Sequence, residues 1–344
     1  MLNPSTISFF MFPGRFLLAL LIGCALVSPA NGQLFRKFGS NPFKKKVEAT
    51  PVKFKSLPSQ QELLASLQVR TTAIKQLKSR VTVDMAGAPK IKGTFQVEFP
   101  NRLRMQAGVM GASEFGVDVG SNERDFWIWS KASLPGQPPA FYFANHAAFA
   151  RSPVRQSIPL EPKWLIEALG LIQYASTDVH VGPTDEGNGL MKLTTIHQTP
   201  TGEHARVTLL SKSNGLIVQQ AIYGPPNPKR ERIAYSNSAD YKYYPEFQTS
   251  LPQKIQLFIA QPGADDLKIE VDLGTYSVNA LFGEPAQMWG MPDPGKDKTI
   301  DLTKISSLNL QPQRFNTQQQ RQNLPSQQSP RTQRDAYSQG SGFR

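Results

Sequence analysis

The sequence predicts a mainly β domain of the α+β class, in which short strands form one antiparallel sheet, strongly curved or partly closed. Three observations support this fold class. Short segments with alternating apolar residues recur between residues 80 and 273, turn sequences such as Ser213-Asn-Gly215 separate several of them, and only two stretches have helical spacing. Regular short strands joined by hairpin turns are typical of an antiparallel sheet with a concave face.

Two helices are expected. The first covers residues 60–79, because Ser59-Gln-Gln-Glu62 matches a capping box that satisfies free backbone N–H groups at a helix start. Apolar residues then recur at helical spacing at Leu63, Leu67, Ile74, Leu77 and Val81. The second helix is expected from Pro162 to Ile172, with proline near its first position and Gly170 as a weakening residue inside it.

The remaining periodic segments are predicted strands. They are 80–85, 94–99, 103–109, 115–119, 126–129, 141–145, 190–197, 205–210, 216–223, 231–236, 253–260 and 267–273. No alternation of strand and helix predicts a parallel sheet.

The N-terminal residues are typical of an exported protein. Arg15 precedes the apolar run 16–23, which is too short to span a bilayer but suits a signal peptide. Two cleavage sites compete. Leu21-Ile-Gly-Cys24 matches a bacterial lipobox, whose thiol would accept a diacylglycerol, whereas small residues at Ala30 and Gly32 match ordinary cleavage before Gln33. Residues 1–32 are therefore a predicted signal peptide, with lipidation of Cys24 as the alternative.

The net charge of +12 lies outside the predicted domain 57–302, in two segments and in Arg15. Residues 33–55 contain seven Lys or Arg and one Glu, and residues 303–344 contain six and one Asp, so the middle of the chain is close to neutral. This distribution argues against nucleic-acid binding. Residues 33–56 are a predicted basic, flexible linker that would lie beside a membrane surface if Cys24 is lipidated. Residues 303–344, rich in Gln and Arg, are predicted to be disordered.

Catalytic and metal-binding patterns are not found. The four histidines lack metal-ligand spacing, and His197 and His204, which flank a predicted hairpin, are expected on the surface. The adjacent acids Asp185-Glu186 lie in a turn, whereas a general acid/base pair needs facing carboxylates. The segment 290–296 has Walker-like spacing, but Asp297 stands where a hydroxyl should hold magnesium. The sequence predicts no catalytic residue, no metal, no cofactor and no enzymatic activity.

The apolar stripes of the first strands exceed what one helix can cover. They indicate either a core filled by the two helices or a concave sheet whose helices cover a cavity for an apolar ligand. The candidate cavity residues are Phe95, Val97, Phe99, Leu103, Met105, Phe115, Val117, Phe126 and Ile128.

The order of these elements resembles the LolA/LolB superfamily of periplasmic lipoprotein carriers and outer-membrane lipoprotein receptors. The resemblance covers residues 60–290. It is carried by the helix 59–78, the aromatic strand Asp125-Phe-Trp-Ile-Trp129, the middle helix, and the segments 251–257 and 267–271. It implies an unclosed β-barrel capped by helices around an apolar cavity. It also implies acyl chains of lipid or lipoprotein as ligands, and a loop residue, here Met110, that contacts the membrane.

Three functions remain open. The first is a periplasmic or outer-membrane-anchored envelope protein that binds acyl chains for lipoprotein sorting or lipid transfer. The second is an envelope interaction or scaffold lipoprotein that acts through its basic C-terminal tail. The third is a hydrolase of envelope polymers, which would need a polar cleft with facing acids.

Overall fold

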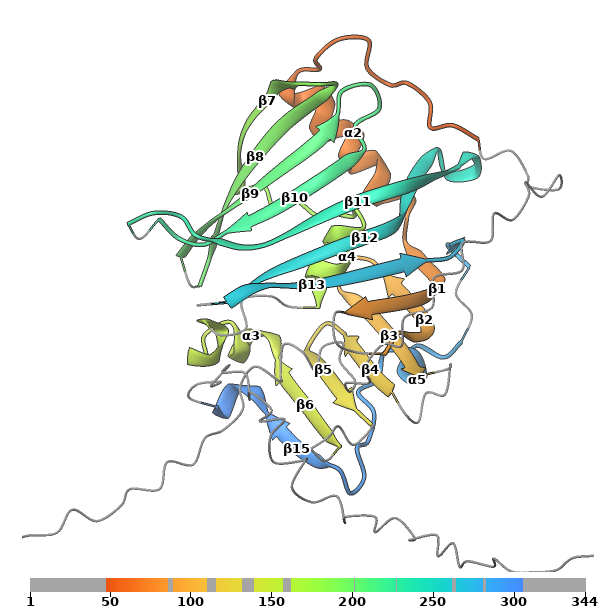
Figure 1. Ribbon diagram of the computed structural model, residues 1–344, viewed down its shortest axis with the longest axis vertical. Helices are drawn as coiled ribbons and strands as arrows, with labels where there is room; N and C mark the ends of the chain where they lie inside the picture. Colours follow the sequence, from red (N-terminus) through yellow and green to blue (C-terminus); the bar gives the residue numbers. More distant parts are fainter. Residues whose placement is uncertain are drawn as a thin grey trace, which may run out of the picture. The chain divides into compact units, whose positions relative to one another are not determined.

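The computed structural model describes residues 48–85, 89–109, 116–131, 139–156, 162–200, 202–226, 228–261, 264–280 and 283–305. Within this part, the strands form one 15-stranded sheet in the order β15-β6-β5-β4-β3-β2-β1-β13-β12-β11-β10-β9-β8-β7, with β14 paired to β1 (Figure 1). The pairs are antiparallel except β15 with β6. The end strands β15 and β7 do not pair with each other in the described part, so the sheet is unclosed. The predicted mainly β, curved and unclosed fold is confirmed.

The strands extend over thirteen residues at most. Their bounds are β1 (Gln76–Met85), β2 (Ile91–Glu98), β3 (Arg102–Val109), β4 (Gly116–Ser121), β5 (Asp125–Ser130), β6 (Ala140–Asn145), β7 (Val179–Gly187), β8 (Leu190–Thr199), β9 (Gly202–Ser211), β10 (Ile217–Tyr223), β11 (Arg232–Tyr244), β12 (Thr249–Gln261), β13 (Ala264–Leu273), β14 (Ser277–Val278) and β15 (Lys298–Asp301). The short helices are α3 (His146–Phe149), η2 (Pro153–Gln156), η3 (Pro245–Phe247), α5 (Pro285–Trp289) and η4 (Leu302–Lys304).

The sheet consists of two meanders that meet at one seam. Strands β1 to β6 pair in sequence order, and so do β7 to β13. Strand β1 joins them by pairing with β13, with Val81 opposite Leu273 and Val83 opposite Val271. The side chains that face inward from both meanders form the main apolar core.

Helix α2 (Gln60–Ala73) begins as the sequence predicts. The side chain of Ser59 accepts from the Glu62 backbone N–H, and the Glu62 side chain accepts from the Ser59 backbone N–H at 2.7 Å. The helix packs Leu63 and Leu67 against β8, β9 and β10. It ends at Ala73, six residues earlier than predicted, and the alternating burial of β1 begins at Leu77. The prediction was too long because Ile74 and Leu77 also fit helical spacing.

Helix α4 (Lys163–Ala168) is shorter than the predicted helix 162–172. Gly170 has a φ of +84°, which glycine adopts readily, so it lies beyond the helix end and not inside it. Pro162 is the N-cap residue and makes no side-chain hydrogen bond. The helix buries Trp164, Ile166 and Ala168 on the concave side of the sheet.

The edge strand β7 was not predicted from the sequence. Pro183 lies within it, and its apolar residues Val179 and Val181 are 59% and 58% exposed, so they do not form a face packed on the core. Its backbone is partly covered by α2, because Gln60 Nε2 donates to the carbonyl oxygens of His180 and Gly182, both at 2.9 Å.

The last part of the predicted linker 33–56 is bound to the domain. The backbone N–H groups of Lys53 and Phe54 donate to the Ser213 carbonyl oxygen at 2.7 and 3.0 Å. At the other end, Ile305 packs against the main core, so folded structure extends slightly beyond residue 302. The predicted signal peptide with Cys24, Met110, Phe115 and most of the C-terminal tail lie outside the described residues. No helix in the described ranges is long and apolar enough to cross a membrane.

Candidate ligand cavity

An apolar cavity of about 70 Å³ lies between the sheet and α4. Every residue that lines it is apolar. The sheet contributes Val83, Phe95, Met105, Val119, Phe126, Ile128, Ile255, Leu257, Ile259, Ile269, Val271 and Leu273, and the cover contributes Pro162, Trp164, Leu165, Ala168, Leu169 and Leu302. Leu165 on α4 and Val271 on β13 are the two lining residues that are only partly buried.

The strand register explains why these side chains meet. Phe95 on β2 lies opposite Met105 on β3, Met105 opposite Val119 on β4, and Val119 opposite Ile128 on β5. Such cross-strand neighbours project from the same face of the sheet. Across the seam, Val83 is paired with Val271, and Val271 with Ile255. Both meanders therefore supply the cavity floor.

The C-terminal end of α4 is held by polar contacts with β9, β10 and β11. Arg206 donates to the Glu167 carboxylate, in an ion pair whose side chains are 9% and 13% exposed. Gln220 Nε2 donates to the Glu167 carbonyl oxygen at 2.8 Å, and Ser238 Oγ donates to the Ala168 carbonyl oxygen at 3.2 Å. The opposite end begins at Pro162 without a side-chain cap. Among the described residues, the side-chain hydrogen bonds that hold α4 thus lie at its C-terminal end.

The structure brings four of the predicted cavity residues to the cavity wall, namely Phe95, Met105, Phe126 and Ile128. Val97, Leu103 and Val117 face the same core but do not line the cavity, and Phe99 is partly buried beside it. Sequence reasoning did not find the residues of β12, β13 and α4. Alternation in 253–260 and 267–273 indicated an inward face there, but no signal in the sequence places that face opposite β2 to β5.

The prediction that His197 and His204 lie on the surface is wrong. His204 is buried and His197 is half-buried, because they face each other across the β8–β9 pair on the inner face, with ring centroids 6.0 Å apart. Burial is the main cause that lowers the pKa of both imidazoles. In the described part of the chain, no group of three or more His, Cys, Asp or Glu residues could hold a metal ion.

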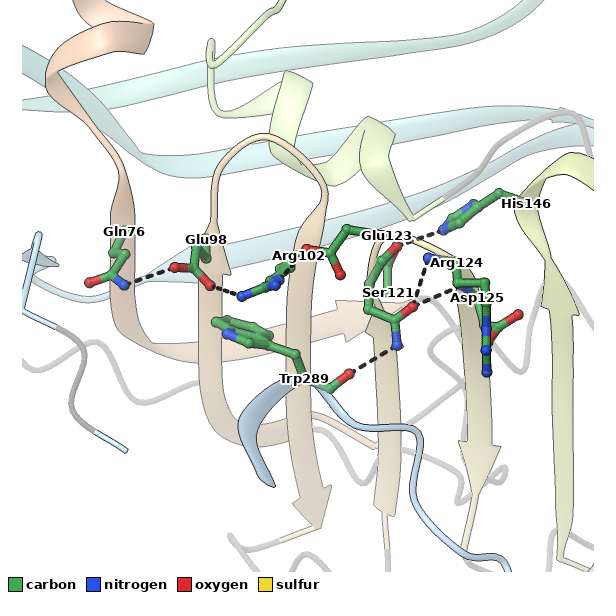
Figure 2. A network of polar contacts seen from close by, with 10 residues as sticks. Gln76, Glu98, Arg102, Ser121, Glu123, Arg124, Asp125, His146 and Trp289 are labelled. Atoms are coloured by element: carbon green, nitrogen blue, oxygen red, sulfur yellow. Dashed lines mark hydrogen bonds and ion pairs between the residues drawn. The ribbon is translucent and has the colours of Figure 1, made fainter. Parts of the chain in front are cut away.

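A polar network crosses the ends of strands β1 to β5, away from the cavity lining (Figure 2). Glu98 accepts from Gln76 Nε2 at 3.1 Å and from Arg102 Nη1 at 2.7 Å, and Arg102 Nε donates to Glu123. Asp125 accepts from Arg124 Nε at 2.9 Å. Each carboxylate of this network has a cationic or amide partner, so the network is an ion-pair chain and not a pair of facing acids.

The same network holds the turn between β4 and β5. The carboxamide oxygen of Asn122 accepts from the backbone N–H groups of Arg124 and Asp125, and its amide donates to the Trp289 carbonyl oxygen at 3.0 Å. His146 Nε2 lies 3.2 Å from Ser121 Oγ. These contacts connect α3 and α5 to the sheet.

Comparison with known proteins finds no family model and no curated protein that matches the sequence. Among solved structures, the chain is similar to a LolA superfamily protein from Nitrosomonas europaea. The sequences are 9% identical, the TM-score is 0.40, and the match covers 67% of this chain and 97% of that one.

Proposed function

We propose that the protein is an exported cell-envelope protein that binds the acyl chains of lipid or lipoprotein in the cavity under α4, for lipoprotein sorting or lipid transfer. The observation that carries this proposal is the lining of the cavity, which is apolar throughout. Water gains few hydrogen bonds in such a space, whereas an acyl chain gains about 0.8 kcal/mol for each methylene it buries. We further propose location in the periplasm or at the outer membrane, from the predicted signal peptide.

The cavity is smaller than a typical ligand site, which has a volume of about 300–1,000 Å³. A complete acyl chain would therefore need α4 to move outward. The contacts at Glu167 and Ala168 would retain the C-terminal end of α4 while its uncapped end opens. The free energy needed for this opening offsets part of the gain from burying the chain, so binding stays reversible. No bond is made or broken, and the protein is not an enzyme under this proposal.

The experiment fills the cavity and compares the effect with the same change elsewhere. Leu257 lines the cavity, whereas Leu193 is equally buried under α2. Leu257→Phe adds volume to an existing space. We expect it to retain stability and to weaken binding of a fluorescent fatty acid by about tenfold, since the ring displaces roughly two methylenes. Leu193→Phe overpacks a core and is expected to destabilise the fold by about 1–3 kcal/mol without changing affinity.

Native mass spectrometry of the exported chain, purified without detergent, gives the direct readout. Co-purified masses of lipid or acylated peptide, reduced in Leu257→Phe but not in Leu193→Phe, would support the proposal. A chain that carries no lipid and takes up none would overturn it. Loss of function on deletion of residues 303–344 would then favour the scaffold role of the tail.

A further inference from the structure

A polar row lies beside the apolar cavity on the same inner face of the sheet. The register places Leu193, Thr208, Gln220, Ser236 and Leu257 opposite one another on the five neighbouring strands β8 to β12. The outer two are apolar, and Leu257 lines the cavity. The middle three are polar, although each is at most 1% exposed. The cavity therefore borders a buried strip of hydrogen-bonding groups.

This strip has unused hydrogen-bonding capacity. Thr208 Oγ1, Gln220 Oε1 and Ser236 Oγ are buried and have no hydrogen-bond partner among the described residues. A buried polar group without a partner destabilises a protein by about 1–3 kcal/mol. Several such atoms in one cross-strand row indicate that a polar molecule or group belongs beside them.

A buried cation, the guanidinium of Arg70 on helix α2, lies near the C-terminal end of α4. Arg70 is 4% exposed, and its Nη2 donates to the Gly215 carbonyl oxygen at 3.1 Å. Its Nη1 has no partner in the described part of the chain, and no described carboxylate forms an ion pair with it. Burial raises the pKa of the neighbouring Tyr174 and Tyr241 to about 12, so neither phenol supplies a negative charge at neutral pH. The charge of Arg70 thus lacks a counter-ion among the described residues.

The row and the cation meet the cavity at the end of α4. Gln220 contacts the Glu167 carbonyl and Ser238 contacts the Ala168 carbonyl. Ala168 and Leu169 line the cavity, and a Cβ atom on the next residue, Gly170, would lie 3.6 Å from Arg70 Nη1. Residues 167–170 therefore border the apolar cavity, the polar row and the guanidinium.

We propose that the ligand is an amphiphile with a carboxylate head, of the long-chain fatty acid class, whose chain occupies the apolar cavity and whose head binds between Arg70 and the Ser236 hydroxyl. This inference rests on the proposed function and names its ligand class. The carboxylate supplies the counter-ion that Arg70 lacks and accepts a hydrogen bond from Ser236 Oγ. Hydrogen bonds to a charged group contribute about 1.5–3 kcal/mol, roughly twice the contribution of neutral ones. A neutral ester of the same length lacks this part of the affinity.

Isothermal titration of the exported chain with dodecanoate and with methyl dodecanoate at pH 8 tests the head site. Both ligands fill the cavity alike, but only dodecanoate carries a charge. We expect dodecanoate to bind at least about tenfold more tightly. In Arg70→Met this preference is expected to disappear while the affinity for the ester stays, and in Arg70→Lys the preference is expected to remain in part. Ser236→Ala removes a hydroxyl that has no internal partner, so it should weaken dodecanoate binding by about fivefold without lowering the Tm.

Each alternative result has a separate meaning. Equal affinities of the unmodified chain for both ligands would overturn the head site, would identify buried water as the partner of the polar row, and would leave the proposed function standing. A parallel loss of both affinities in Arg70→Met would assign Arg70 a structural role only. Failure of the unmodified chain to bind either ligand would overturn the proposed function itself. If Arg70→Met does not fold, the affinities of the unmodified chain and of Ser236→Ala for dodecanoate and methyl dodecanoate still test the head site.

Discussion

The two helices on the inner face of the sheet differ in how they are held. Helix α2 has 14 residues, a complete capping box and two leucines packed into a closed apolar cluster with β8, β9 and β10. Helix α4 has six residues, no side-chain cap and a cavity beneath it. Figure 1 shows α2 beside the strands of the second meander and α4 beside β12 and β13. The same sheet thus carries one cover with a complete cap and one whose polar contacts, among the described residues, lie at its C-terminal end.

The largest difference is expected from truncations under the two helices. Leu63→Ala removes a fully buried side chain below α2 and is expected to lower the free energy of unfolding by about 2–5 kcal/mol. Leu165→Ala on α4 removes a partly buried side chain beside an existing space and should lower it by about 1 kcal/mol. Chemical denaturation of both variants measures the two losses in the free energy of unfolding. Equal losses would contradict the distinction between the covers.

Substitution of Gly170 tests the end of α4 alone. Gly170→Ala forces alanine into a φ of +84°, which should destabilise the protein by about 1–2 kcal/mol. The added Cβ would lie 3.5 Å from Ile217 Cδ1, an ordinary contact, so the effect comes from the backbone. Thermal unfolding gives the magnitude, and Gly187→Ala, at a φ of +76° with open space around it, is the matched control. A change in ligand affinity only in Gly170→Ala would show that this end of α4 controls the cavity.

The N-terminal cap of α2 is expected to contribute less to stability than the residues above. Ser59→Ala removes the side-chain acceptor for the Glu62 N–H and is expected to lower stability by about 1 kcal/mol. Ligand affinity should not change, since α2 does not line the apolar cavity and Ser59 precedes the helix start, at the opposite end of α2 from Arg70. Unfolding curves and a ligand titration of the same variant check both expectations. A loss of affinity without a loss of stability would contradict the assignment of α2 as a fixed cover.

The smallest expected effect is a dependence on pH in the second meander. Burial lowers the pKa of His180, His197 and His204, and Arg206 adds to the effect at His197. The folded protein therefore binds protons less readily than the unfolded chain near pH 6.5, so this stability is present above that pH and is lost as the pH falls through the lowered values. The Tm should decrease from pH 7.5 to 5.5, and His204→Gln should reduce the decrease. A Tm that rises over this interval would show the opposite linkage.

Local patterns in the sequence predict most elements but not their ends. The capping box at Ser59 and the alternation in β2 and β3 were sufficient to place α2 and these strands. Leu77 and Val81, four residues apart, fit both the helical and the strand period, so the junction between α2 and β1 could not be located from spacing. Strand β7 was missed because its exposure and its proline remove the usual strand signal.

The candidate cavity is predictable in part for the same reason. The alternation of apolar residues along β2 and β3 correctly identifies the inward-facing residues, which are Phe95, Val97, Leu103 and Met105. Which of these rows lies under α4 depends on the pairing of β1 with β13, a contact between distant parts of the sequence. Arg70 and the row from Thr208 to Ser236 gave no signal at all, because polar residues at alternating positions are equally typical of a solvent-facing strand.

The seam between β1 and β13 has a consequence for the order of folding. Nearly all other neighbours in the sheet are neighbours in the sequence, so each meander consists of local hairpins that can form early. The cavity requires Val83 from one meander and Ile255, Ile269 and Leu273 from the other. It therefore does not exist in any intermediate that contains a single meander. A chain truncated before β13 would leave β1 and β12 as additional unpaired edges, exposed to the chaperones and proteases around it, and would have no place for a ligand.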